Sequence, residues 1–284
     1  MSVNKLILNE FELYSKATAN TENCSLKKII FDKNSDHQIS NTRDCVNLDF
    51  IYARQNQIVL DLFKSWISNN PQFIRTTAQY NSCACLDVGS QHNFITLLAT
   101  WANFIIADPS LNSKDKNSSI TMDGIGVNWR SIEAQELSTY FSNDQFGWIS
   151  SLHAIEHFGL GRYGDTLDVL GDIKGLKEIH NVLHKSGMFV GSVPVTSIKN
   201  ERIIFNRNRI YSTKTIMNML SAAGFKIIYD IIVIASSDHL INQHTQTQIT
   251  TLDVNTFNKA NEQKFDNLDI EKIPDALYIW AAIK

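Results

Sequence analysis

The sequence predicts an α/β fold, built on a doubly wound, mostly parallel sheet of seven strands with an N-terminal helical extension. From residue 83 onward, short apolar runs alternate with segments that carry apolar residues at helical spacing. Several of these runs end in Gly, Asp or Ser, the residues that close a strand with a turn. A chain of 284 residues, 43% of them hydrophobic, can also bury the large core that such a fold needs.

The N-terminal part of the chain is the least patterned. It is rich in Asn, Lys, Asp and Ser, so we expect residues 1–50 to form an extension and residues 51–284 to form the main domain. The main domain opens with residues 51–69, which place apolar side chains at helical intervals. An Asn-Asn-Pro triplet follows and ends this predicted helix.

The alternation of strands and helices then continues in order. In the first half of the main domain we predict strands at 83–88, 104–107, 120–122 and 148–152, with helices at 94–101 and 133–141. In the second half we predict helices at 176–183 and 213–223, and strands at 187–195, 225–235 and 277–283. Gly224 directly follows a predicted helix and is expected to cap it. This alternation implies parallel strands with helices on both faces of the sheet.

Composition narrows the function classes. A formal net charge of −3 gives no broad basic surface, so we expect no nucleic acid partner. The polar N-terminus does not resemble a secretory signal, and no apolar run reaches membrane-spanning length. The four cysteines, Cys24, Cys45, Cys83 and Cys85, form no Cys-x-x-Cys pair, which favours reduced thiols and a cytoplasmic protein.

Polar residues follow four of the predicted strands. Gly89-Ser90 follows the first strand, Asp108 the second and Asp123 the third, and Ser151–His153 closes the fourth. Ligands bind at the carboxyl ends of parallel strands where the strand order reverses, so we expect these residues to form one site. A carboxylate at 108 suits a ribose diol, and one at 123 can accept a hydrogen bond from an adenine amino group. Taken singly, an Asp at a strand end more often closes a turn.

These residues carry a resemblance to a known family. The run Leu86-Asp87-Val88-Gly89-Ser90, the two strand-end aspartates, the Ser150–His157 stretch and Ser186-Gly187 resemble the class I S-adenosylmethionine-dependent methyltransferases. The resemblance implies a Rossmann-like fold and S-adenosylmethionine as the cofactor. It assigns cofactor binding to Asp87, Gly89, Ser90, Asp108, Asp123 and Ser151. The first turn keeps one glycine, whereas the family pattern has two or three.

A narrower resemblance covers the second half of the chain. Residues 151–165, Val193-Pro194 and residues 205–211 look like the bacterial "domain of unknown function 268" family, which is methyltransferase-like and associated with surface-polysaccharide gene clusters. This resemblance implies an O-methyltransferase that acts on a glycan or nucleotide-linked sugar. The single glycine of the first turn keeps a second hypothesis open, a non-catalytic protein that binds or scaffolds in polysaccharide assembly.

The densest cluster of titratable side chains lies between residues 150 and 165. His153, Glu156 and His157 have the spacing that places side chains on one helical face. Three hypotheses stay open for them: ligands of a divalent metal ion, as in related sugar- and phenol-directed methyltransferases; a general base for a substrate hydroxyl; or histidines that fix the loop by hydrogen bonds. The same string occurs in some zinc peptidases, so a metal-dependent hydrolase is a third possible function, although Gly159 and Gly161 interrupt the helix it needs.

The loop that follows completes the predicted site. We add Arg162 and Asp165 to the catalytic set; Arg162 can bind a phosphate or carboxylate of the acceptor, or pair with Asp165. Amide, guanidinium and aromatic groups suit a sugar or another small-molecule acceptor. Substrate binding is therefore assigned to Tyr163, Asn206, Arg209 and Tyr211. For the last three residues the alternative is a polar loop that leads into the helix at 213.

Overall fold

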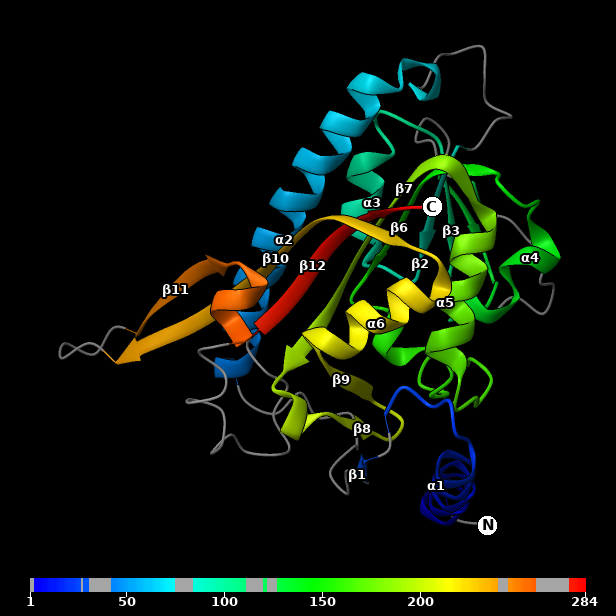
Figure 1. The fold of residues 1–284 in the computed structure, drawn as a ribbon, viewed down its shortest axis with the longest axis vertical. Coiled ribbons are helices and arrows are strands. Elements are labelled where there is room, and N and C mark those ends of the chain that lie inside the picture. The colour runs from blue at the N-terminus through cyan, green and yellow to red at the C-terminus, as the bar shows by residue number, and fades with distance from the viewer. Residues whose placement is uncertain are drawn as a thin grey trace.

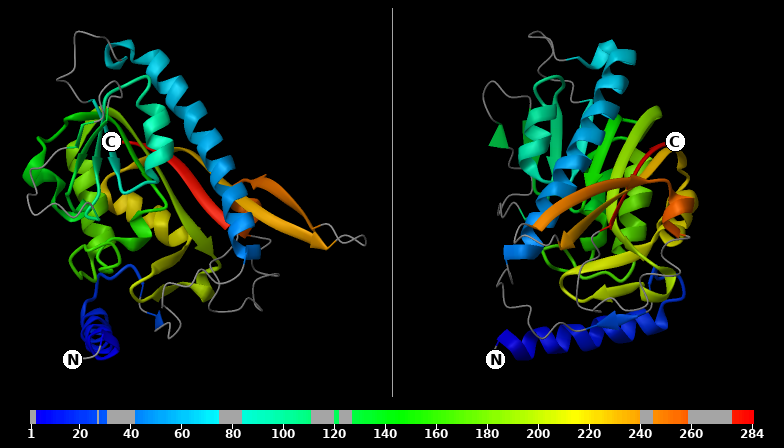
Figure 2. Two further views of the ribbon diagram at one scale, coloured as in Figure 1. Left: turned by 180° about the vertical axis from the view of Figure 1, so that it is seen from behind. Right: turned by 90° about the vertical axis from the view of Figure 1, so that its left-hand side faces the viewer.

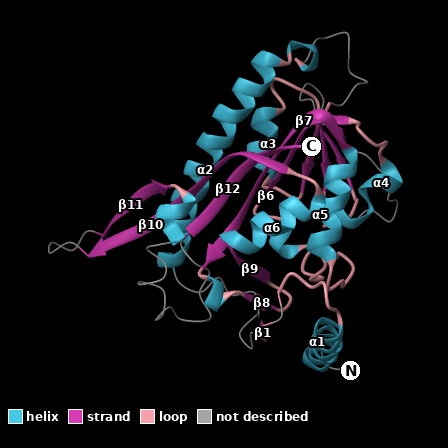
Figure 3. Cartoon of the chain, in the orientation of Figure 1, coloured by secondary structure: helices cyan, strands magenta, loops and turns pink. Residues whose placement is uncertain are grey.

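The computed structural model describes residues 3–26, 28–30, 42–74, 84–110, 120–121, 127–239, 245–258 and 276–284. Within these residues a twisted, mostly parallel sheet runs through the centre of the molecule, with helices packed on both of its faces (Figure 1). The strands and helices separate clearly into these layers when coloured by type (Figure 3). The predicted α/β class is therefore confirmed.

Six of the seven central strands overlap the strands predicted from the sequence, and the third does not. The seven strands are β2 (Cys85–Val88), β3 (Phe104–Ala107), β5 (Val127–Arg130), β6 (Phe146–Leu152), β7 (Leu183–Thr196), β10 (Lys226–His239) and β12 (Ala276–Ile283). Across the sheet they lie in the order β5-β3-β2-β6-β7-β12-β10, and β12 is antiparallel to both of its neighbours. The chain thus winds outward from β2 in one direction and from β6 in the other, which is the doubly wound arrangement.

Helices cover both faces of this sheet. The helices α2 (Thr42–Asn69) and α3 (His92–Leu98) pack on one face, and α4 (Leu137–Tyr140), α5 (Gly171–Val182) and α6 (Thr213–Ala223) pack on the other. The ends of α6 follow the sequence closely. The Ser212 hydroxyl accepts from the Thr215 amide at its start, and Gly224 adopts a φ of 103° at its end, as predicted. No helix in the described ranges is long and apolar enough to cross a membrane.

The predicted third strand is wrong in its pairing. Residues 120–121 form β4 (Ile120–Thr121), but this strand is antiparallel to β5 and lies at the edge of the sheet. The third parallel strand is β5, which has one buried residue and three half-buried ones, so the sequence lacks a continuous apolar run there. Asp123 lies outside the described residues. Because it follows an antiparallel strand, the reason for placing it at the carboxyl edge of the parallel sheet is lost.

A second correction concerns residues 202–212, which include the predicted polar loop. They form a hairpin of β8 (Arg202–Ile204) and β9 (Asn208–Ser212), and β9 extends the main sheet by pairing with β7. Arg209 and Tyr211 lie on β9 with fully buried side chains. A short strand, β1 (Ile29–Ile30), pairs with β8, and β11 (Thr245–Leu252) pairs with β10 to form an arm that extends from the body (Figure 1).

The N-terminal residues are tied to this hairpin. Helix α1 (Val3–Asn20) lies along the lower end of the molecule, beneath β8 and β9 (Figure 2, right). Tyr14 from α1 and Leu26 after it are buried in the same cluster as the helices α5 and α6. The predicted boundary at residue 51 falls inside α2, which begins at Thr42. The division into an extension and a main domain stays a prediction.

Candidate functional site

The strand order reverses between β2 and β6. From β2 the chain proceeds to β3 on one side, and from β6 it proceeds to β7 on the other. The two strands pair in parallel, with Asp87 opposite Ser150. Their carboxyl ends therefore bring the turn at Gly89-Ser90 beside the segment that starts at His153, which is the position where ligands bind in such sheets.

The first turn is held by hydrogen bonds within the protein. The buried Asp87 carboxylate accepts from the Ser90 amide at 3.0 Å and from the Ser150 hydroxyl at 2.7 Å. The Ser90 hydroxyl accepts from the Leu152 amide at 2.8 Å, and the Ser151 hydroxyl donates to a β2 carbonyl. Gly89 adopts a φ of 75°, which favours glycine. Asp87, Ser90 and Ser151 thus shape the turn, and Gly89 supplies its backbone.

We expect Asp87 to make the stability of the fold depend on pH. Burial raises the pKa of Asp87 from 3.8 to about 6, against the opposing effect of its hydrogen bonds to Ser90 and Ser150. A carboxyl group with a raised pKa stabilises the fold below its unfolded value and loses that contribution as pH rises through the folded value. From pH 4 to 6, wild type should lose on the order of 2–3 kcal/mol of stability relative to Asp87→Asn. Urea unfolding of both proteins across this range measures the difference, and parallel curves would contradict it.

Asp108 lies at the end of β3, as predicted, and has an unpredicted partner. The Nε2 atom of His92, in the first turn of α3, lies 2.8 Å from one oxygen of Asp108, and the Ser110 amide donates to the other at 2.8 Å. The His92 ring also packs on Trp129 from β5, with ring centroids 5.8 Å apart. The hydrogen bond that His92 donates to the Asp108 carboxylate raises the pKa of His92, although burial opposes it. Nothing in the sequence except proximity to the first turn indicates this pair.

The segment after β6 turns sharply into the site. His153 has a φ of 55°, the left-handed region that side chains other than glycine rarely occupy. Its amide donates to the carbonyl of Ser192 on β7 at 3.0 Å, which holds it there. The single 3₁₀ turn Ile155–His157 follows in place of the predicted α-helical face. Strained backbone that the surroundings hold in place occurs often at functional sites.

Glu156 is fully buried and paired with His153. The Nδ1 atom of His153 lies 2.6 Å from Glu156 Oε1, while the side chain of His153 remains 12% exposed. Neither oxygen of Glu156 has a hydrogen-bond partner of good geometry in the described part of the chain, so the contact with His153 is an ion pair. Burial alone would raise the pKa of Glu156, but the positive potential and short contact of His153 hold it below its usual value. The carboxylate is therefore charged, and it fixes the orientation of the imidazole.

His157 has a different environment from His153. Its Nδ1 atom lies 2.5 Å from the carbonyl oxygen of Arg207, so this nitrogen carries the proton. Its Nε2 atom is 3.9 Å from Glu156 Oε1. Burial lowers the pKa of His157 to about 4, although the Glu156 charge raises it. At neutral pH His157 is therefore an uncharged ring with low proton affinity.

The three side chains do not converge as a metal site. In the described part of the chain, no group of three His, Cys, Asp or Glu side chains is placed to hold a metal ion. The physical reason is that Glu156 is turned inward against His153, while His157 gives its Nδ1 proton to the β8–β9 hairpin. The predicted divalent metal ion gains no support from this geometry.

Aromatic rings flank the buried carboxylate on both sides. Tyr52 from α2 packs edge-on against the His153 ring at 4.9 Å, and Tyr163 packs edge-on against the His157 ring at 5.2 Å. Arg162 lies over the Tyr163 ring, 5.3 Å from its centroid. Tyr163 was predicted for substrate binding, whereas Tyr52 was missed because nothing distinguishes it from other half-buried positions of its helix.

The loop after this turn is held by Asp165. One of its oxygens accepts from the Gly159 amide at 2.8 Å and from the Gly161 amide at 3.3 Å, and the other accepts from the Tyr163 amide. Arg162 donates to the Arg207 carbonyl at 3.2 Å. The Arg162 side chain is thus exposed and bonded to the β8–β9 turn, while Asp165 binds backbone amides; binding of an acceptor by Arg162 stays a prediction.

The residues predicted for substrate binding on 206–211 do not gather at the surface of the site. Asn206 lies in the turn between β8 and β9 with a φ of 55°, which Asn tolerates. Arg209 donates to the Phe158 carbonyl at 2.6 Å and to the Tyr14 hydroxyl at 2.9 Å. The Tyr211 hydroxyl donates to Asp172 at 2.9 Å. Arg209 therefore binds the segment after Glu156 on its buried side, and Tyr211 binds Asp172 next to it.

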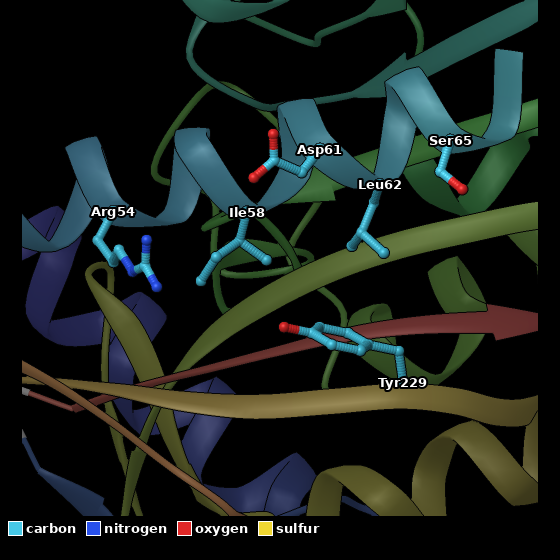
Figure 4. Close-up of a pocket in the computed structure, with 6 residues that line it drawn as sticks. All are labelled: Arg54, Ile58, Asp61, Leu62, Ser65 and Tyr229. Atoms are coloured by element: carbon cyan, nitrogen blue, oxygen red, sulfur yellow. The ribbon is translucent and has the colours of Figure 1, made fainter. Parts of the chain in front are cut away.

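A separate groove of about 290 Å³ lies on the outer surface between α2 and β10 (Figure 4). Its lining residues are Arg54, Ile58, Asp61, Leu62, Ser65 and Tyr229. The ring of Tyr229 lies beneath the helix, and none of the predicted site residues is among the six. Because the groove is away from the carboxyl ends of the strands, we leave it out of the candidate site.

A comparison with family models identifies the family of this chain. A family model described as "Caenorhabditis protein of unknown function, DUF268" matches residues 112–264, more than half of the chain. The chain belongs to this family. The predicted DUF268 family is confirmed, but its bacterial attribution is not supported, because the description names Caenorhabditis. The DUF268 match contains the turn at 153–157 and the β8–β9 hairpin, and it begins after Asp108.

Comparisons of this DUF268 protein with curated proteins and with solved structures add little. No curated protein matches the chain. A methyltransferase of Thermotoga maritima, titled a possible histamine N-methyltransferase, is 15% identical, with 83% of this chain and 99% of that one covered and a TM-score of 0.38. An S-adenosylmethionine-dependent methyltransferase of Archaeoglobus fulgidus is 15% identical, with 79% and 94% covered and a TM-score of 0.43. Sequence identities and TM-scores this low say nothing about the activity of this chain.

Proposed function

We propose that this DUF268 protein transfers the methyl group of S-adenosylmethionine to a hydroxyl group of a glycan or nucleotide-linked sugar. One observation carries the proposal. The strand order reverses between β2 and β6 at the carboxyl edge of the sheet. The glycine turn after β2 and the carboxylate of Asp108 lie on one side of this point, and the buried His153–Glu156 pair lies on the other. A donor site and an acceptor site placed in this way can meet above the sheet.

The residues on the donor side fit a nucleoside. Asp108 keeps 13% of its side chain exposed. Its carboxylate accepts from the His92 ring and from Ser110, and a carboxylate has about four lone-pair sites, so it can also accept from a ribose hydroxyl. Gly89 allows the positive φ of the first turn and its close packing against Ala154, which fixes the turn beside Asp108. When bound there, the cofactor supplies an activated methyl group.

The residues on the acceptor side fit proton removal from a hydroxyl. His153 places Nδ1 toward Glu156, so its Nε2 lone pair can accept the hydroxyl proton. Once His153 has accepted that proton, its positive charge lowers the pKa of Glu156, and the carboxylate in turn stabilises the imidazolium. Tyr52 and Tyr163 provide the aromatic surfaces on which a sugar ring can stack. Alignment of the acceptor oxygen with the methyl group then accounts for most of the remaining catalysis.

Calorimetric titration with S-adenosylhomocysteine tests the donor site. Wild type should bind it, and Asp108→Ala should weaken binding by about 1–3 kcal/mol, the cost of a lost hydrogen bond to a charged group. Asp144→Ala is the matched control, since this carboxylate precedes β6 at the opposite edge of the sheet and is bonded to Lys284 at 2.6 Å. Unchanged affinity in folded Asp108→Ala would remove Asp108 from the site.

The same titration decides between the proposal and the scaffold hypothesis. The first turn has the single glycine Gly89, followed by Ser90 and Gln91, which favours a protein that has lost cofactor binding. A folded wild type that produces no binding heat with S-adenosylhomocysteine would support that second hypothesis. The buried, charged Glu156 beside a strained histidine disfavours it, because a scaffold gains nothing from this costly arrangement.

A further inference from the structure

The segment behind the acceptor site is held by a buried arginine. Arg209 on β9 is fully buried, and its guanidinium donates to the carbonyl of Phe158, two residues after Glu156, at 2.6 Å. A charged group can be buried at this depth only if its partners are good. Here Asp172, in the first turn of α5, lies 3.5 Å from Arg209 Nε, and the Tyr14 hydroxyl accepts from Nη2 at 2.9 Å.

The ring of Phe158 links this anchor to the rest of the site. A Cβ atom added at Gly175 of α5 would lie 2.6 Å from the Phe158 ring, and one added at Gly89 would lie 3.9 Å from it. The ring is therefore wedged between the helix and the first turn. Gly159 and Gly171 approach each other just as closely behind it, which leaves this segment little freedom as long as its carbonyl is anchored.

We infer that Arg209 is a positioning residue that holds the turn carrying Glu156 and His157 in place, and that Tyr14 makes helix α1 part of this support. The inference rests on the proposed acceptor site. It differs from the substrate-binding role predicted for Arg209 from sequence, because the guanidinium points at protein groups on every side. The sequence predicts residues 1–50 only as an N-terminal extension. In this inference, helix α1 supports the site through the Tyr14 hydroxyl.

The electrostatics around Arg209 support a permanent charge. Burial alone would lower the pKa of Arg209, but the Asp172 carboxylate and the two nearby tyrosines together raise it by more, so the guanidinium stays protonated. Burial raises the pKa of Tyr14 to about 12, so its hydroxyl keeps its proton and accepts from Arg209 through oxygen. Phe11 and Tyr14 also pack on Phe205, next to the β8–β9 turn, with centroids 5.6 and 5.3 Å away.

Hydrogen exchange of the full chain, followed by mass spectrometry, tests this inference. Tyr14→Phe removes only the hydroxyl and leaves a buried donor of Arg209 unpaired, and Arg209→Lys removes the fork that reaches Phe158 and Tyr14 together. Both should raise exchange in residues 155–163 roughly tenfold, while β2 and β3 keep their protection. Tyr14→Phe keeps the test valid if Arg209→Lys does not fold.

Tyr278→Phe is the matched control. Tyr278 is also fully buried, and its hydroxyl donates to Asp230 at 3.0 Å, on β12 and β10 rather than behind the turn. This variant should leave the exchange of residues 155–163 unchanged relative to other segments. The inference is overturned if folded Tyr14→Phe exchanges like wild type in this segment, or if Tyr278→Phe gives the same local increase. Binding of S-adenosylhomocysteine to wild type tests the proposed function separately, because the exchange result does not depend on it.

Discussion

Replacing His153 with alanine is expected to reduce methyl transfer by about 10²–10⁴-fold, the range for loss of a general base. The imidazole is placed for this role by the 2.6 Å contact between its Nδ1 and Glu156, which leaves Nε2 to accept a proton. The side chain is only 12% exposed and is the partner of the buried Glu156 carboxylate, so its loss should also lower the thermal midpoint. The affinity for S-adenosylhomocysteine should change little, because the proposed donor side does not include this pair.

His157→Ala is the matched comparison, and the two variants should differ in their loss of rate. His157 donates to the Arg207 carbonyl and packs on Tyr163, so its removal should lower the thermal midpoint. Its low pKa makes it a weak proton acceptor at neutral pH, so its effect on rate should be smaller than that of His153.

Both variants are measured by transfer of a labelled methyl group to sugars selected in a screen, alongside thermal unfolding. A rate loss that is larger for His157→Ala than for His153→Ala would assign the base to His157 instead. Equal loss of rate in both variants would mean that the two rings act together on the acceptor. In that case the His153–Glu156 pair is not the sole base.

The sequence predicts most of the central sheet because its strands are buried on both faces. Such strands read as continuous apolar runs, as in Phe104–Ala107, where the predicted and observed bounds agree. The cap at Gly224 is equally local, since a left-handed residue after a helix requires little more than glycine. Strands near the edge of the sheet, such as Val127–Arg130, carry polar residues, and their pairing is decided by neighbours elsewhere in the chain.

The candidate site was predicted in part for the same reason. His153, Glu156 and His157 lie where the fourth strand delivers them, because strand ends can be read locally. The direction of each side chain cannot be read locally, since it depends on partners such as Arg207, which is 50 residues away from His157. Arg209 was misassigned because a charged residue in a polar run normally faces water, and only tertiary contacts make its burial acceptable.

The largest effect on stability is expected from Asp172→Ala, at about 3–5 kcal/mol, the cost of leaving a buried charge without its partner. Asp172 accepts from the Tyr211 hydroxyl at 2.9 Å and the Ser25 hydroxyl at 2.5 Å, and it faces Arg209. Asp168→Ala is the control: Asp168 pairs with the half-exposed Lys174, so its loss should cost less than about 1 kcal/mol.

Urea unfolding of these variants measures the difference, and a third variant separates charge from packing. In Asp172→Ala/Arg209→Met the buried charge is removed together with its partner, so stability should recover by more than about 1 kcal/mol relative to Asp172→Ala alone. If the double variant is as unstable as the single one, the loss comes from the hydroxyl partners of Asp172 rather than from Arg209. If Asp172→Ala costs no more than Asp168→Ala, the buried network does not stabilise the fold, and the support that it gives to the turn at Phe158 must come from packing alone.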